Sequence, residues 1–217
     1  MTQEANPISP DASIRNAAVE RLKWAIEMNH ILGSFAMCGP YHSPLGVFSG
    51  AGPTATEKGH AVEVLRKAAE FAAQAKLTLA IEYLNRFECY FLTTAADARA
   101  LVKAVDHPSF RCMYDTFHAH IEEKSQAAGV AAVKDVFAHV HISENDRGTP
   151  GRGHAKIREA IAVLKELGYD GWLTVEAFGR ALPELAAATR VWRDFFANPE
   201  EVYTEGYRYI RQCWDAA

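Results

Sequence analysis

Two kinds of hydrophobic pattern alternate along the chain. Short apolar runs predict buried β-strands, and stretches with an apolar residue every three or four positions predict amphipathic helices. The expected strands occupy 35–38, 77–82, 110–115, 137–142 and 172–176. The expected helices occupy 9–32, 54–74, 95–105, a helical stretch that reaches about 135, 155–167, 183–196 and 198–214.

Polar residues mark several of the helix ends. Ser9, followed by Pro10 and an acid, is typical of an N-cap, and Gly33 is typical of a helix end. Thr54 and Glu57 have the spacing of a capping box, in which each side chain bonds the other residue's backbone N–H. These signals support the pattern of alternating strands and helices.

Strands that alternate with helices predict a parallel sheet covered by helices, so the fold class is α/β. A complete (β/α)8 TIM barrel usually takes about 250 residues, whereas only about five strands are expected here. We therefore expect a single domain over 1–217 that is an N-terminally incomplete TIM barrel. The open edge of such a barrel would expose apolar surface. The four tryptophans are expected in core or interface packing: Trp24, Trp172, Trp192 and Trp214.

Composition narrows the class of protein. The chain has 217 residues, of which 49% are hydrophobic and 23% charged, with a net charge of −4. This balance is typical of a globular domain and argues against nucleic acid as the main partner. No run approaches the roughly 18 apolar residues of a membrane span, so no membrane partner is expected. The scattered cysteines predict free, buried thiols in a reducing, cytoplasmic setting: Cys38, Cys89, Cys112 and Cys213.

Four chemically active side chains come at the ends of successive predicted strands. They are Glu82, Asp115, His141 and Glu176. In an α/β barrel the C-terminal strand ends form one rim, so these residues would project toward one point. Three carboxylates and one imidazole suit Mn²⁺, Mg²⁺ or Co²⁺, and Zn²⁺ is also compatible. Any one of the four could instead be an ion pair or a hydrogen-bonded core group.

Other polar residues lie near this expected rim. Glu88 follows Glu82 in a loop with an aromatic lining from Phe87, Tyr90 and Phe91. His118 comes three residues after Asp115 and could donate to a substrate oxygen, whereas His120 and Glu122 are expected to be exposed.

The segment 139–154 carries two histidines and an arginine. His139 and His141 share one face of a strand, which predicts one ligand at the rim and one deeper, hydrogen-bonded ring. Arg147 is expected either to bind substrate oxygens or to pair with Glu144 or Asp146.

Four stretches resemble the D-tagatose 3-epimerase and D-allulose (psicose) 3-epimerase family of xylose isomerase-like barrels. They are IEYLNRFECYFLTT, YDTFHAHIEE, HVHISENDRGTPGRGH and WLTVEAF. The resemblance implies an isomerase with a divalent metal, expected as Mn²⁺ with Co²⁺ as the alternative, held by Glu82, Asp115, His141 and Glu176. It also implies that Glu88, His118 and Arg147 bind the ketose hydroxyls. The segment HAKI stands where family members often carry a tryptophan, which would alter packing or specificity.

The implied reaction inverts C3 of a free ketose such as D-tagatose, D-allulose, D-fructose or L-ribulose. It requires removal of a proton beside the carbonyl and its return on the other face, so Glu82 and Glu176 are the expected acid/base pair. An aldose–ketose isomerase or a hydroxypyruvate isomerase would also use two carboxylates and a metal. A third reading is a non-catalytic truncated barrel that assembles with another subunit. The expected partners are a small ketose and further copies of the chain in a homodimer or homotetramer.

Overall fold

The computed structural model describes residues 1–217 without a gap, as two compact units. The first unit comprises residues 1–114 and 135–139, and the second comprises residues 115–134 and 140–217. The strands β3 and β4 each contribute residues to both units.

Thirteen helices and strands alternate along the chain, much as the hydrophobic pattern predicts. In order they are α1 (Ala12–Ile31), β1 (Ala36–Gly39), α2 (Ala55–Gln74), β2 (Thr78–Ile81), α3 (Ala95–Val105), β3 (Phe110–Asp115), α4 (Thr116–Glu122), α5 (Gln126–Ala132), β4 (Phe137–Ile142), α6 (Ile157–Glu166), β5 (Leu173–Val175), α7 (Pro183–Thr189) and α8 (Pro199–Ala216). The strands follow the sheet order β1-β2-β3-β4-β5. The pairs β1–β2, β2–β3 and β4–β5 are parallel.

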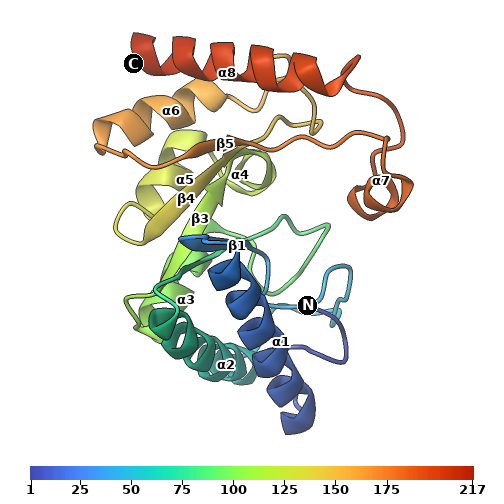
Figure 1. Ribbon diagram of the computed structural model, residues 1–217, viewed down its shortest axis with the longest axis vertical. Coiled ribbons are helices and arrows are strands. Elements are labelled where there is room, and N and C mark those ends of the chain that lie inside the picture. The colour runs from blue at the N-terminus through green and yellow to red at the C-terminus, as the bar shows by residue number, and fades with distance from the viewer. The chain divides into compact units, whose positions relative to one another are not determined.

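The first unit contains β1, β2 and most of β3, and its helices α1 and α2 pack on β1 and β2 respectively. Helices α1 and α2 lie side by side, and α2 also contacts α3 and β2 (Figure 1). Strand β2 is almost fully buried: Leu79, Ala80 and Ile81 have no exposed surface, and neither does Leu65 of the neighbouring α2. This packing holds β2 in place, and it therefore also fixes the position of the residue that follows the strand, Glu82.

In the second unit, α5 packs on α6, and α8 lies along α6 and against β5 (Figure 1). The apolar face of α6 supplies Ile157, Ile161 and Leu164, all with at most 1% exposure. Because α8 packs against β5, the segment that follows β5 starts from a supported position.

Most of the capping residues predicted at the helix ends are confirmed. The Thr54–Glu57 capping box is present at α2 with both reciprocal bonds, and Asn198 caps α8. Gly33 adopts a left-handed φ of 72° just after α1. The N-cap prediction for α1 was wrong by two residues, because Asp11 rather than Ser9 accepts the N–H of Ser13.

Two helix predictions were too long. The expected helical stretch after 115 is two helices, because the backbone is extended at Glu123 and a new cap at Ser125 starts α5. The expected helix 183–196 ends at Thr189, since Arg190 turns into the left-handed region with φ 58°.

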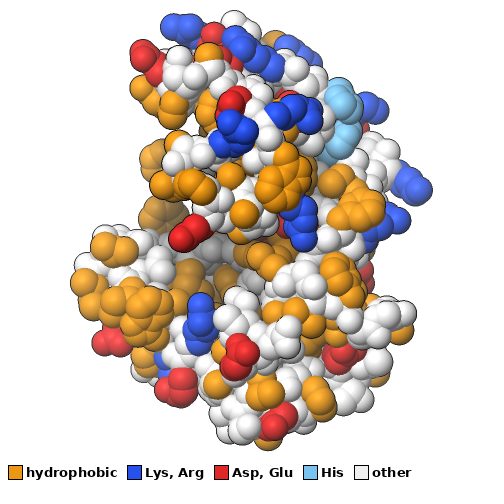
Figure 2. Space-filling view, turned by 90° about the vertical axis from the view of Figure 1, so that its right-hand side faces the viewer, with side chains coloured by type: hydrophobic (Ala, Val, Ile, Leu, Met, Phe, Trp, Pro, Cys, Tyr) orange, Lys and Arg blue, Asp and Glu red, His pale blue; other side chains and the backbone are white.

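Two large aromatic side chains on or beside β5 are exposed, as expected at an open sheet edge. Trp172 is 66% exposed and Tyr207 of α8 is 63% exposed. Figure 2 shows hydrophobic side chains lying among charged ones on the face that it draws. Core packing is therefore wrong for Trp172, and also for Trp24 and Trp192, which are exposed too, so the alternative of interface packing stays a prediction for these three. None of the helices has both the length and the apolar character needed to cross a membrane.

Candidate metal centre

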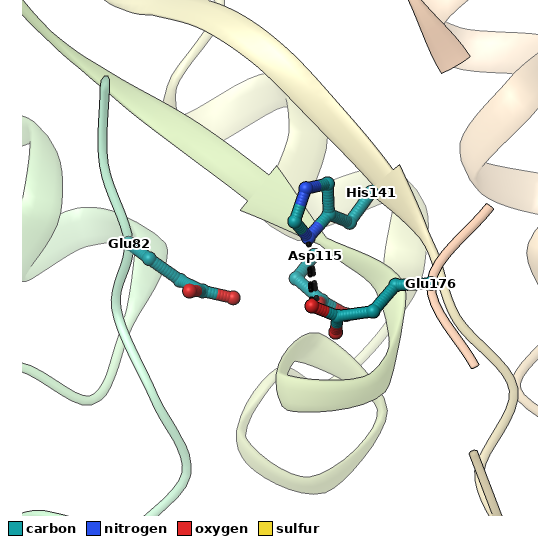
Figure 3. A group of neighbouring side chains, drawn as sticks. All are labelled: Glu82, Asp115, His141 and Glu176. Carbon is teal, nitrogen blue, oxygen red and sulfur yellow. Dashed lines mark ion pairs between the residues drawn. The ribbon is translucent and has the colours of Figure 1, made fainter. Parts of the chain in front are cut away.

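Three of the predicted ligands meet at the strand ends of the second unit (Figure 3). Asp115 is the last residue of β3, His141 is the penultimate residue of β4, and Glu176 directly follows β5. The N–H of Glu176 bonds the carbonyl of Ile142 at 3.1 Å, which continues the β4–β5 pairing to this position. The parallel register therefore brings the residues together, as the strand-end argument predicts.

The three side chains converge on a small space. His141 Nδ1 lies 3.3 Å from Glu176 Oε1 and 3.7 Å from Asp115 Oδ2, and one ligand atom from each residue lies within 4.8 Å of the others. The second carboxylate oxygen of Asp115 caps α4 by accepting the N–H of Phe117 at 2.7 Å. This cap orients Oδ2 toward the imidazole. Two carboxylates and one imidazole nitrogen form a donor set that fits a divalent metal ion.

The site is electrostatically prepared for a cation. Burial alone would raise the pKa of Asp115, but the neighbouring His141 imidazole and the charge of Arg147 hold it well below its usual range. Burial alone would lower the pKa of His141, but the nearby carboxylates of Asp115 and Glu176 raise it to about 10. Without a metal, the imidazolium and the guanidinium of Arg147 together balance the charge of the two carboxylates.

Arg147 completes the charge balance of this group. Its Nη1 donates to Glu176, to Ser143 Oγ at 2.9 Å and to Asp115 Oδ2 at 3.4 Å. The expected alternative, an ion pair with Glu144 or Asp146, is wrong, because the guanidinium pairs with the carboxylates of the cluster instead.

His118 lies on α4 beside the same guanidinium. Its Nε2 is 3.2 Å from Arg147 Nη2, and its ring packs edge-on to Phe117 with 5.1 Å between centroids. Burial lowers the pKa of His118 to about 3, and the neighbouring Arg147 charge acts in the same direction. The ring is therefore neutral at neutral pH and can accept a hydrogen bond from Arg147.

His120 and Glu122, expected to be exposed, are half-buried.

The remaining predicted site residues belong to the first unit. Glu82 directly follows β2, is buried, and donates its backbone N–H to the carbonyl of Gly39 at 3.0 Å. Glu88 is half-buried and accepts from Asn85 Nδ2 at 2.8 Å. Phe87 is 68% exposed, so the expected aromatic wall beside Glu88 does not include it.

Three residues near the centre were not identified from the sequence. Ser143 holds Arg147, Thr116 exchanges two hydrogen bonds with the backbone of Ser143, and Phe117 lies against the guanidinium. Each of the three lies within two residues of a predicted strand end. That position was the one feature of the sequence that could have identified them as site residues.

The fold and these side chains define a class of protein. It is an α/β-barrel protein whose strand ends carry acids and a histidine that could hold a metal ion. The chain belongs to the xylose isomerase-like TIM barrel family, whose model matches residues 2–213. This confirms the fold predicted from the sequence.

Several relatives of the chain are named as epimerases, which are isomerases. The chain is 32% identical over 197 residues to a Synechocystis protein named as a probable ketose 3-epimerase, covering 91% of this chain and 69% of the relative. It is 32% identical over 228 residues to the D-psicose 3-epimerase of Ruminiclostridium cellulolyticum, covering 97% and 75%. A solved D-allulose 3-epimerase from Methylomonas sp., in complex with D-allulose, superposes with a TM-score of 0.92 at 27% identity, covering 97% and 74%. The resemblance found in the sequence motifs is confirmed.

Proposed function

We propose that this protein is a metal-dependent epimerase that inverts C3 of a free ketose. The observation that carries the proposal is the group of Asp115, His141 and Glu176 at adjacent strand ends, in a chain that is 32% identical to a D-psicose 3-epimerase. The substrate class is that of D-allulose, D-fructose, D-tagatose or L-ribulose.

The proposed metal ion is Mn²⁺, with Co²⁺ or Mg²⁺ as alternatives, because hard carboxylate oxygens predominate among the donors. Asp115, His141 and Glu176 would hold it, and Glu82 is proposed as the fourth ligand. When bound, a divalent ion polarises the substrate carbonyl and makes the adjacent C–H more acidic.

Glu82 and Glu176 are the proposed acid/base pair. One carboxylate removes the proton from C3, and the other returns a proton to the opposite face of the planar enediolate. Both residues directly follow the C-terminal end of a parallel strand, which is where the catalytic residues of α/β barrels lie. The configuration of the substrate decides which carboxylate acts first.

The proposed ketose ligands are Glu88, His118 and Arg147. Arg147 has a cationic fork that can donate to several hydroxyl oxygens, and neutral His118 can exchange a hydrogen bond with one of them. Phe117 and Phe178 face the guanidinium at 3.6 and 5.1 Å from its carbon to the ring centroids. These rings support the arginine and exclude water around it.

We further propose that the protein acts in the cytoplasm as a homodimer or homotetramer. The exposed apolar side chains near β5, such as Trp172 and Tyr207, support self-association because such surface is costly to leave in water. Sedimentation over a range of concentrations tests this proposal.

The test of the proposed chemistry is an epimerisation assay on Glu82→Gln and Glu176→Gln. Each amide keeps the size of the carboxylate but cannot act as a base, so turnover should fall by about 10²-fold or more. Glu184→Gln, which changes an exposed acid on α7, is the matched control and should retain wild-type activity. Appreciable activity in either site variant would refute the acid/base assignment.

A further inference from the structure

The loop between β4 and α6 carries Arg147 and closes around one buried carboxylate. Glu144 is only 2% exposed. Its Oε2 accepts the N–H of Gly151 at 2.9 Å, and its Oε1 accepts the N–H of Ala155 at 2.7 Å. Glu144, near the start of the loop, is thus bonded to two later points of the same loop.

The backbone of the loop is shaped to fit this carboxylate. Gly151 has a left-handed φ of 89°. At Gly153, an added Cβ would lie 2.5 Å from Glu144 Cγ and 2.2 Å from Asn145 Oδ1, so any larger residue would displace these side chains. Asn145 Oδ1 also accepts the N–H of His154 at 2.7 Å. The glycine allows the backbone to approach the two polar side chains closely.

Arg147 lies inside the closed loop and depends on it for its own conformation. Its N–H bonds the carbonyl of Glu144 at 3.0 Å, and its φ of 65° is left-handed, which is unusual for a residue with a side chain. Such a conformation persists only where the surroundings determine it. The observed backbone directs the guanidinium to Ser143, Asp115 and Glu176.

A second, outer anchor joins the loop to α8. Thr149 Oγ1 and Arg152 both donate to Glu201 Oε1, at 2.9 and 2.5 Å. Arg152 is 53% exposed at its side chain, so water can replace this contact far more easily than it can replace the bonds of buried Glu144. The outer anchor therefore offers a matched control.

We propose that Glu144 is a positioning residue that holds Arg147 in place against Asp115 and Glu176. This inference rests on the proposed function in one respect, namely that these carboxylates bind a metal ion. Glu144 acts through the loop backbone and touches neither the metal nor the substrate. Gln at this position would offer one acceptor and one NH₂ group, so one of the two loop N–H groups would lose its partner.

The experiment measures the affinity of the metal-stripped protein for Mn²⁺ alone, by calorimetric titration. The variants are Glu144→Gln, Arg147→Met, the double variant and the control Glu201→Gln. Removing a positive charge 3.4 Å from Asp115 Oδ2 should tighten Mn²⁺ binding of Arg147→Met by roughly fivefold. Glu144→Gln should shift affinity in the same direction, the double variant should bind no more tightly than Arg147→Met, and Glu201→Gln should match the wild type.

Three results would overturn the proposal. They are a wild-type Mn²⁺ affinity for Glu144→Gln, a shift in Glu144→Gln that Arg147→Met does not share, and a double variant that shows the sum of the two effects. If Glu144→Gln does not fold, Glu144→Asp serves instead, because its shorter carboxylate cannot reach both N–H groups. The titration needs no ketose, so the result for Glu144 stands apart from whether the chain epimerises a sugar.

Discussion

The guanidinium carbon of Arg147 lies 3.6 Å from the centroid of the Phe117 ring. This contact joins the loop after β4 to the start of α4, where Asp115 caps the helix. The aromatic face stabilises the cation, which also pairs with Asp115 and Glu176. A long, flexible side chain is thereby fixed beside the candidate metal ligands.

We predict that Phe117→Leu weakens ketose binding without removing catalysis. Loss of a cation–π contact worth about 0.5–2 kcal/mol should raise KM roughly 2- to 30-fold with little change in kcat. Steady-state kinetics on the fastest ketose substrate measure this split. Phe195→Leu is the matched control, because Phe195 stacks under Arg193 rather than under Arg147. A large fall in kcat with an unchanged KM would contradict this role.

Metal binding should release a proton from His141. Its pKa of about 10 in the absence of metal means that the imidazole is protonated at pH 7.5, yet only the neutral ring can bind a metal ion. Calorimetry in two buffers of different ionisation enthalpy should report release of about one proton per Mn²⁺.

The sign of the pH dependence follows from this release. As pH rises toward about 10, the proton competes less, so Mn²⁺ affinity should increase by about tenfold per pH unit between roughly pH 7 and 9. His154→Asn, which changes an exposed histidine, should leave both results unchanged. An affinity that is independent of pH in this range would be inconsistent with a protonated His141.

Much of the fold could be predicted because local pattern and tertiary packing agree. The capping box of α2 and the apolar periodicity of α3 gave the observed bounds. The two errors in helix length occur where the backbone conformation interrupts a helical pattern that continues in the sequence. Arg190 is an acceptable helix residue by propensity, and only its left-handed conformation ends α7.

The candidate site was predictable where it depends on strand ends. Asp115, His141 and Glu176 come together because parallel strands in register present their C-terminal residues at one edge. The partners of Arg147 were not predictable, since a long side chain from a loop can reach several acids. The nearest acids in sequence were the wrong choice, because Glu144 is already bonded to the loop backbone.

Thr116 should contribute to stability through one buried pair of hydrogen bonds. Its Oγ1 donates to the carbonyl of Ser143 at 2.7 Å and accepts the N–H of Ser143 at 2.8 Å. Thr116→Val keeps the shape but leaves both backbone groups buried and unbonded, so the free energy of unfolding should fall by about 1–3 kcal/mol.

Urea unfolding of the metal-free protein measures this loss. Thr174→Val is the matched control, because Thr174 is exposed on β5 and its substitution should change stability by less than about 0.5 kcal/mol. Equal stability of the two variants would show that the Thr116–Ser143 pair does not stabilise the fold.

Metal-dependent inversion of C3 can be measured by following the two epimers of a ketose. The protein is stripped with a chelator, and D-fructose and D-tagatose are then incubated with it before and after Mn²⁺ or Co²⁺ is restored. Chromatography should show the C3 epimer of at least one sugar only after metal is restored. For D-fructose, the same ratio of D-fructose to D-allulose should be reached when the reaction starts from D-allulose. Absence of any C3 epimer from the metal-loaded protein, or an equal rate without metal, would contradict the account.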